Sequence, residues 1–337
     1  MLYSLARPIL FCADPETAHH LAFAALDTQA KLGLARAWVG VVPKKPVQVM
    51  GIDFPNPIGL AAGLDKNAEH LDGLAQLGFG FIEVGTLTPQ PQPGNPQPRM
   101  FRLVEHEALI NRLGFNNRGV ADALPRLTAR SIKVPVGVNI GKNAVTPIER
   151  ATDDYLSALR SVYAVADYIT VNISSPNTKN LRDLQASKAV AKLVKTLVKE
   201  RDLLAKSRGR RVPLAVKIAP DLNDDDLIDT VHAICANGAD AIISSNTTLS
   251  RSDVESHPRA NEAGGLSGAP LTARADRVLE RVVKAAESVP VIGVGGVMRV
   301  EDAQRKLDLG AKLVQIYTGM LYRGPGFVGE LVRGIRL

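Results

Sequence analysis

The sequence predicts an α/β protein built on a (β/α)8 barrel with a two-helix extension at its N-terminus. After about residue 56, eight short apolar runs alternate with helical patterns, and polar or glycine residues follow nearly every run. The first 40 residues stand outside this alternation, and 337 residues accommodate one barrel of about 250 residues with additions. We therefore expect a helical hairpin over residues 1–40 and a barrel over residues 41–337.

The eight predicted strands are short and nearly all apolar, as strands buried in a parallel sheet should be. They cover residues 57–61, 81–85, 134–140, 168–173, 214–218, 241–245, 291–294 and 313–317. Helical patterns separate most of them, for example over residues 68–77, 153–166, 224–237, 273–286 and 300–309. A doubly wound open sheet is the alternative. The polar residues after so many strands favour the barrel, which gathers all eight strand ends into one mouth.

Residues 1–33 predict two short helices joined by a tight turn. Asp14 is a plausible N-cap with Pro15 at the first helical position, and Gly33 is expected to stop the second helix after about residue 31. One face of that helix carries His19, Phe23 and Leu26. The hairpin has more apolar surface than so small a unit needs. Residues 87–99, with five prolines, predict an irregular loop before the next elements.

The net charge of +7 has a local source. Nine Lys and Arg residues between 186 and 211, Arg201 among them, exceed the acidic residues of that segment by seven. Apolar residues recur there at helical spacing, so we expect an amphipathic helix with a solvated basic outer face. Contact with anionic lipid or RNA is the less favoured interpretation. No aromatic residues interleave with the basic ones, and no nucleic-acid partner is expected.

Cys12 and Cys235 lie far apart without CxxC spacing, so neither a disulfide framework nor a metal site is expected. A reducing, cytosolic setting is the default for such a chain. No apolar run reaches the ~18 residues that a membrane-spanning helix needs. The N-terminal stretch also fits a signal peptide poorly, because Arg7 and Pro8 interrupt it.

Asparagine is unusually frequent where the predicted strands end and in one further loop. Five of these residues are expected to point into the barrel mouth: Asn111, Asn139, Asn172, Asn177 and Asn246. A carboxamide offers donors and an acceptor together, which suits a cyclic imide or ureide with alternating N–H and C=O groups. A single asparagine often only caps a turn, but five at equivalent positions make that explanation poor.

Glycines follow the seventh predicted strand at Gly295 and Gly296, and Tyr317-Thr318-Gly319 ends the eighth. Loops after strands 7 and 8 of such barrels commonly bind phosphate through backbone N–H groups. A phosphorylated planar cofactor beside a ureide-like substrate indicates FMN. Lys217, near the end of the fifth strand, would place a cation beside the reduced flavin. A buried, paired lysine is the structural alternative for Lys217.

Eight motifs, in order over nearly the whole chain, resemble those of class 2 dihydroorotate dehydrogenases. They read GLAAGLDKN, NRLGFNN, VNISSPNT, AVKIAPDL, SNTTL, GGLSGAPL, IGVGGV and LVQIYTG. The resemblance implies that dihydroorotate is oxidised to orotate in pyrimidine biosynthesis, that FMN accepts the hydride, and that ubiquinone or menaquinone reoxidises the flavin. It also implies a monomer held peripherally at the cytoplasmic face of the cell membrane.

Carried over by position, Ser175 matches the base that removes the substrate's C5 proton, and Thr178 and Phe115 match residues that relay that proton and shape its site. Substrate contacts are expected at Lys66, Asn111, Arg112, Leu113, Gly114, Phe115, Asn172, Asn177, Asn246 and Thr247. FMN contacts are expected at Ala61, Ala62, Gly63, Lys66, Thr86, Asn139, Asn172, Lys217, Ser245, Gly268, Gly295, Gly296, Tyr317 and Thr318. His19 and Arg102 match the quinone entrance. The family usually has Thr at position 245 and Ser at 318, and both exchanges keep the hydroxyl.

Other functions remain as alternatives. A class 1 dihydroorotate enzyme would carry Cys where Ser175 stands and would lack the hairpin. A dihydrouridine synthase would need a basic RNA surface and a catalytic Cys, but no Cys follows a predicted strand. A phosphate-binding barrel without redox chemistry is the alternative outside flavin enzymes. Released flavin in the purified protein would exclude it.

Overall fold

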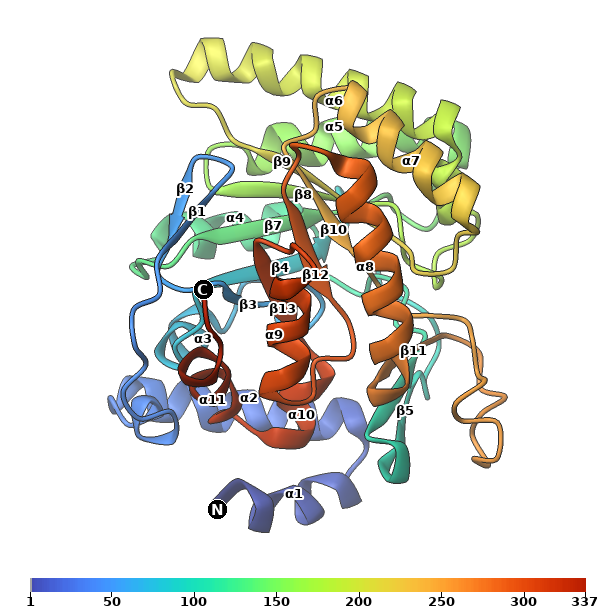
Figure 1. The fold of residues 1–337 in the computed structure, drawn as a ribbon. Helices are drawn as coiled ribbons and strands as arrows, with labels where there is room; N and C mark the ends of the chain where they lie inside the picture. Colours follow the sequence, from blue (N-terminus) through green and yellow to red (C-terminus); the bar gives the residue numbers. More distant parts are fainter. Residues whose placement is uncertain (1) are drawn as a thin grey trace.

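Eight parallel strands close into a barrel in the computed structural model, which describes residues 2–337 (Figure 1). Neighbours in the barrel follow chain order, and the last strand pairs with the first. The strands are β3 Ile58–Leu60, β4 Phe81–Leu87, β7 Val136–Ile140, β8 Tyr168–Asn172, β9 Leu214–Ile218, β10 Ala241–Ser244, β12 Val291–Val294 and β13 Leu313–Ile316. The barrel and each of its eight strands are thus confirmed, with ends that differ from the predicted ones by two residues or fewer.

Helices surround the barrel, and the main core lies between them and the strands. They are α3 Leu71–Gln76, α4 Val120–Ala129, α5 Ala151–Val162, α6 Ser187–Arg208, α7 Asp224–Ala236, α8 Thr272–Ala286, α9 Val300–Asp308, α10 Thr318–Arg323 and α11 Phe327–Gly334. The first of these begins three residues later than predicted. Ala68 has a φ of 57°, a left-handed conformation that no right-handed helix accommodates.

The N-terminal hairpin consists of α1 Leu2–Cys12 and α2 Pro15–Lys31. Asp14 caps the second helix as predicted, because its Oδ1 accepts hydrogen bonds from the N–H groups of Glu16 and Thr17. A short 3-10 helix, η1 Ala35–Trp38, follows. In Figure 1 both hairpin helices lie at the end of the molecule opposite α6. Within residues 2–337, no helix has the length and apolarity to cross a membrane.

Two small sheets were not predicted. β1 Val47–Val49 and β2 Ile52–Phe54 form an antiparallel hairpin whose apolar residues join a cluster inside the barrel, where Phe54 contacts Phe81. β5 Met100–Leu103, β6 Ala108–Asn111 and β11 Gly265–Gly268 form a three-stranded sheet that pairs Asn111 with Gly265. These strands of three or four residues are too short to show a period, so their sequences resemble loops.

The basic segment forms α6, but Arg201 was placed wrongly on its outer face. Only 3 % of Arg201 is exposed, and its guanidinium pairs with Asp202 and with Asp240, which lies just before β10. Asp240 in turn accepts the N–H of Leu214 at 2.8 Å. Arg201, which was expected on the solvated face of the helix, therefore links α6 to the barrel through its ion pair with Asp240.

Candidate active site

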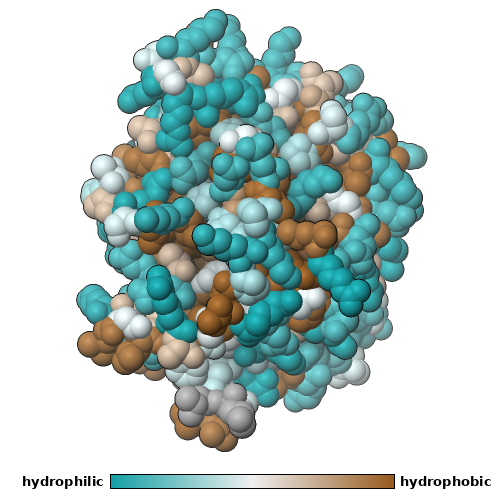
Figure 2. All heavy atoms as spheres, turned by 60° about the vertical axis from the view of Figure 1, so that its left-hand side comes forward, coloured by the Kyte–Doolittle hydropathy of each residue, from teal (hydrophilic) through white to brown (hydrophobic). Residues whose placement is uncertain are grey.

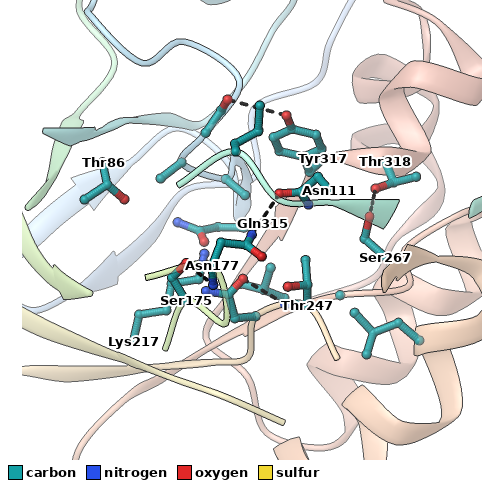
Figure 3. Close-up of a pocket in the computed structure, with 18 of the residues that line it drawn as sticks. Thr86, Asn111, Ser175, Asn177, Lys217, Thr247, Ser267, Gln315, Tyr317 and Thr318 are labelled. Atoms are coloured by element: carbon teal, nitrogen blue, oxygen red, sulfur yellow. Dashed lines mark hydrogen bonds between the residues drawn. The ribbon is translucent and has the colours of Figure 1, made fainter. Parts of the chain in front are cut away.

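A cavity opens at the carboxyl ends of the strands, with an empty volume of about 1030 Å³. Most of the residues expected to contact substrate or cofactor line it: Ala61, Ala62, Gly63, Lys66, Thr86, Asn111, Leu113, Gly114, Phe115, Asn172, Ser175, Asn177, Lys217, Asn246, Thr247, Gly268, Gly295, Gly296, Tyr317 and Thr318. Figure 3 shows several of these side chains converging from different strand ends.

Four of the five asparagines line the cavity, while Asn139 lies one layer below it and is fully buried. Asn139 accepts a hydrogen bond from Thr86 at 2.6 Å and donates to the Glu83 carboxylate at 2.8 Å. Asn172 donates to Thr86 at 3.0 Å. The expectation that all five would face the mouth thus holds for four. Asn139 instead holds Thr86, the residue to which Asn172 donates.

On the other side of the mouth, Asn177 donates to the Oδ1 of Asn111 at 3.2 Å (Figure 3). Asn111 ends β6, so the unpredicted small sheet holds this asparagine in place. Arg112 does not line the cavity. Its guanidinium pairs with Glu262 at 2.7 Å and stacks on Phe101, which ties the adjoining loops together.

Ser175 lines the cavity and is 6 % exposed. Its Oγ accepts the N–H of Asn177 at 3.2 Å, which leaves the hydroxyl proton free to be passed on. The Oγ1 of Thr178 is buried and has no hydrogen-bond partner among the described residues. Phe115 has a φ of 54° and packs against Gly141, where a Cβ would come within 2.9 Å of its ring. That contact requires glycine.

Lys217 is buried at the cavity wall, and its ammonium group makes no hydrogen bond or ion pair with any other part of residues 2–337. Burial lowers its pKa, and the negative charge of Glu83 opposes this shift. Glu83 is itself fully buried and accepts hydrogen bonds from four side chains: Asn139, Tyr168, Thr170 and Gln315. A satisfied buried carboxylate thus lies beneath an unpaired buried cation.

Lys66 lies on the loop after β3, and the buried carboxylate of Asp65 shapes this loop by accepting the N–H groups of Glu69 and His70 at 2.9 Å. Burial lowers the pKa of Lys66 to about 8, although Glu16 opposes the shift. Among the described residues, Lys66 has no hydrogen-bonding partner. Its cation is therefore available to an anionic ligand.

At the far end of the cavity, Gly295 and Gly296 have φ values of 104° and 69°. A Cβ at Gly296 would collide with the backbone of Thr272, so the chain requires glycine there. The N–H of Gly296 finds no acceptor within the described chain. Thr318 donates to the Oγ of Ser267 at 2.9 Å, as Figure 3 shows. Ser245 is fully buried below this end.

A second, mostly apolar cavity of about 1330 Å³ lies beneath the N-terminal hairpin. His19 and Arg102 both line it, as do Phe23 and Leu26 of the predicted helix face. Burial lowers the pKa of His19 to about 3, and the nearby Lys66 adds to the shift. Arg102 donates to the carbonyl of Ala13 at 2.7 Å, which binds the hairpin's turn to β5.

Tyr317 lines both cavities. Its hydroxyl donates to the carbonyl of Gly63 at 3.4 Å, and burial raises its pKa. A smaller polar cavity also touches Tyr317 and contains Lys66 and His19 in its wall. Tyr317 therefore belongs to the walls of both the polar mouth and the apolar pocket.

Several residues of the site were not predicted from the sequence. Glu83 and Gln315 lie within strands that look wholly structural, although a Glu inside an apolar run is a signal that could have been used. Ser267 belongs to the unpredicted β11. Ser174 stands next to the predicted base and is fully buried. Only their side-chain contacts reveal what they do.

A family model described as dihydroorotate dehydrogenase matches residues 45–336. The chain belongs to this family. Among curated relatives, one from Chromobacterium violaceum named "Dihydroorotate dehydrogenase (quinone)" is 55% identical, and the match covers 99% of this chain and 97% of the relative. One of the same name from Neisseria meningitidis serogroup B is 51% identical over 99% of both chains. These matches include the hairpin, which the family model leaves out.

Solved structures agree. The dihydroorotate dehydrogenase of Eimeria tenella in complex with ferulenol has a TM-score of 0.85 and 37% identity, covering 95% of this chain and 90% of that one. The ligand-free form of the Eimeria enzyme has a TM-score of 0.83 and 36% identity, covering 93% of each chain. The barrel is thus the fold of this family of oxidoreductases, and the Eimeria structures match this chain over more than nine tenths of its length.

Proposed function

We propose that this oxidoreductase converts dihydroorotate to orotate in pyrimidine biosynthesis, with FMN as the hydride acceptor and a membrane ubiquinone or menaquinone as the final acceptor. One observation carries the proposal: a polar mouth and an apolar pocket meet at Tyr317. A polar substrate and a lipid-soluble acceptor need two such environments on opposite sides of one cofactor. The relatives that are named quinone enzymes support the same reading.

The residues present fit FMN. Lys217 supplies an unpaired cation for the polar edge of a flavin ring, and the free N–H of Gly296 suits a phosphate oxygen. The Oε1 of Gln315 is buried in the cavity wall without a hydrogen-bond partner in the described chain. When bound, FMN would supply the two-electron acceptor that amino-acid side chains lack. Thr318 and Gly295 would complete the end of the cavity that receives the phosphate group.

Around the substrate, the asparagines would bind the ring's N–H and C=O groups, and Lys66 its carboxylate. Ser175 would take the proton from the carbon next to the one that loses hydride. A serine hydroxyl is a weak base, so it must pass its own proton onward as it accepts this one. The unpaired Oγ1 of Thr178 lies three residues along and provides a candidate next acceptor.

The apolar pocket would receive the quinone ring and the start of its tail. His19 is neutral at ordinary pH and can donate one hydrogen bond to a quinone carbonyl, while Arg102 adds a cation. Large apolar side chains are exposed on the N-terminal segment, with Leu5 and Ile9 at 73% and 75%. Figure 2 shows hydrophobic side chains interspersed with hydrophilic ones at this lower end of the molecule.

Residues 1–40 would accordingly serve as the quinone entrance and as a peripheral contact with the cytoplasmic face of the cell membrane. Residues 41–337 would form the FMN-binding barrel. We propose that the working unit is a monomer, which the lining of both cavities by residues of one chain supports.

The decisive experiment mixes the purified protein with dihydroorotate without oxygen and follows the flavin absorbance. We expect the flavin to bleach, and the colour to return on addition of a quinone but not of fumarate or NAD. Failure to bleach would refute dihydroorotate as the substrate. Reoxidation by fumarate or NAD at the quinone rate would favour a class 1 activity instead. A colourless protein that releases no flavin would refute the redox function.

A further inference from the structure

Ser174 lies beside Ser175, yet it does not line the cavity and is fully buried. Its Oγ donates to the Oδ1 of Asn172 at 2.9 Å and accepts from the Nδ2 of Asn246 at 2.7 Å. A single hydroxyl thus joins two cavity asparagines from different strands: Asn172 ends β8, and Asn246 follows β10.

Backbone donors fix the direction of these bonds. The N–H of Ser174 points at the Oδ1 of Asn172 at 3.2 Å, and the N–H of Thr247 points at the Oδ1 of Asn246 at 2.8 Å. An N–H group can only donate, so each of these amide ends must be the oxygen. The Nδ2 of Asn246 then faces the Ser174 hydroxyl, whose own proton is directed to Asn172.

The two asparagines differ in how much else holds them. Asn172 is also anchored through Thr86 and Asn139, a chain that ends on the Glu83 carboxylate. Asn246 has no such second support: apart from its neighbour Thr247, its side chain is held within the described chain by Ser174 alone. Removing the hydroxyl would therefore loosen Asn246 most.

The bonds also determine what remains for a ligand. Asn172 uses one Nδ2 hydrogen on Thr86 and its oxygen on Ser174, so one hydrogen is left to donate. Asn246 uses one hydrogen on Ser174 and keeps the second, together with a lone pair on its oxygen. A donor on one side and a donor with an acceptor on the other match a ring with alternating C=O and N–H groups.

We propose that Ser174 is a positioning residue for the substrate, whose buried hydroxyl holds Asn172 and Asn246 in the orientation that the ring of dihydroorotate requires. This inference rests on the proposed function. Ser174 touches neither the cavity nor the reacting atoms, so it acts through the two amides. Its neighbour Ser175 acts in the chemical step. Two adjacent serines thus divide binding and catalysis between them.

The test compares Ser174→Ala with Ser175→Ala in the FMN-loaded, full-length protein. Leaving the two amide groups without their partner should weaken orotate binding and raise the KM for dihydroorotate on the order of 10- to 100-fold. The rate of flavin reduction at saturating substrate should fall by no more than about threefold, because the base is intact. Ser175→Ala should show the reverse split. Ser174→Cys retains a weak donor and should lie between wild type and Ser174→Ala.

Thr230→Val is the matched control, because it also removes a fully buried hydroxyl, but one on α7 that donates to the carbonyl of Gln185 and has no contact with either asparagine or with Glu83. Its orotate affinity should stay within about threefold of wild type. In an Asn246→Ala background, Ser174→Ala should weaken binding much less than it does alone.

Unchanged orotate affinity in Ser174→Ala would overturn the proposal, as would a loss equal to that of Thr230→Val. Loss of FMN or of folding in Ser174→Ala would also overturn it, by making the hydroxyl structural. Full additivity with Asn246→Ala would exclude action through that amide. Wild-type protein that binds orotate but is not reduced by dihydroorotate would instead contradict the proposed function, so the two failures are distinguishable.

Discussion

The barrel mouth and the apolar pocket beneath the hairpin (the hairpin pocket) both include Tyr317, but they differ in the side chains that form their walls. In the mouth, polar side chains are tied to one another and to the buried Glu83 by hydrogen bonds whose direction is fixed. In the hairpin pocket, apolar side chains surround a few polar ones, among them His19, Gln29 and Arg102. The mouth can therefore discriminate ligands by donor and acceptor pattern, whereas the pocket selects by shape and apolarity.

The two regions also differ in how they are attached. The mouth stands on the ends of barrel strands, which share one core. The hairpin is attached through one buried side chain, Phe23, that joins this core, and through polar contacts such as the Arg99–Glu16 ion pair at 2.8 Å and the His70–Asp27 contact at 2.8 Å. Changes to the hairpin surface should thus leave the mouth unaffected, and changes to the mouth should leave the pocket able to bind an apolar ligand.

The strongest separation should come from Ser175→Ala. Removing a general base costs on the order of 10²–10⁴-fold, so flavin reduction by dihydroorotate should slow by that factor. Orotate should still bind, and chemically reduced flavin should still be reoxidised by quinone at the wild-type rate. Stopped-flow measurement of each half-reaction checks this. Near-normal reduction by the Ala variant would exclude Ser175 as the base.

A charge on α1 should have the opposite effect. Leu5→Glu with Ile9→Glu replaces two exposed apolar side chains without touching the core, and should weaken liposome binding on the order of 10- to 100-fold. Turnover with a long-chain quinone should fall, while dihydroorotate-driven bleaching and turnover with a short soluble quinone should not.

Leu203→Glu provides the control for that experiment. Leu203 is 53% exposed and lies on α6, at the other end of the molecule in Figure 1. This variant should bind liposomes as wild type does. Equal losses from both ends would mean that net charge, rather than the hairpin, governs membrane contact.

Within the mouth, Lys66 should make orotate binding depend on pH. With a pKa lowered to about 8, Lys66 is cationic below that value and loses its charge above it. An anionic ligand prefers the cation, so orotate affinity should fall about tenfold per pH unit above the pKa in the limiting case. Equilibrium titrations at pH 7 and pH 9 would measure this. Lys66→Met should bind weakly at both, and a persistent pH effect in that variant would assign the titration elsewhere.

The barrel could be predicted from sequence because its eight strands are continuous apolar runs, a pattern that burial on both faces imposes. The three-stranded sheet that positions Asn111 could not. Its strands span four residues each, and β11 is half glycine, so their pairing is set by tertiary contacts rather than by local preference. The prediction for Arg201 was wrong for a related reason. Helical spacing alone does not show that its ion-pair partner Asp240 lies on the barrel side of the helix.

For the site, residues with unusual chemistry at strand ends were identifiable, and most of them line one cavity. Ser174 and Gln315 were not, because their importance comes from what they contact across the barrel. Gln315, for example, donates to a carboxylate 232 positions earlier in the chain. No spacing rule in one sequence encodes a contact of that separation. The quinone residues depended on resemblance alone, since an isolated His and Arg carry no pattern.

The smallest expected effect concerns His19 and sharpens the contrast with Lys66. A histidine in water changes charge near pH 6.5, but burial beneath the hairpin lowers the pKa of His19 to about 3. The imidazole is therefore neutral throughout pH 5.5 to 7.5, and reoxidation of reduced flavin by a short soluble quinone should vary less than about twofold over that range. His19→Asn keeps a neutral donor and should show the same flat profile. A rate that titrates near pH 6.5 in wild type but not in His19→Asn would show that the imidazole is exchanging its proton, and that the pocket is wetter than its apolar walls imply.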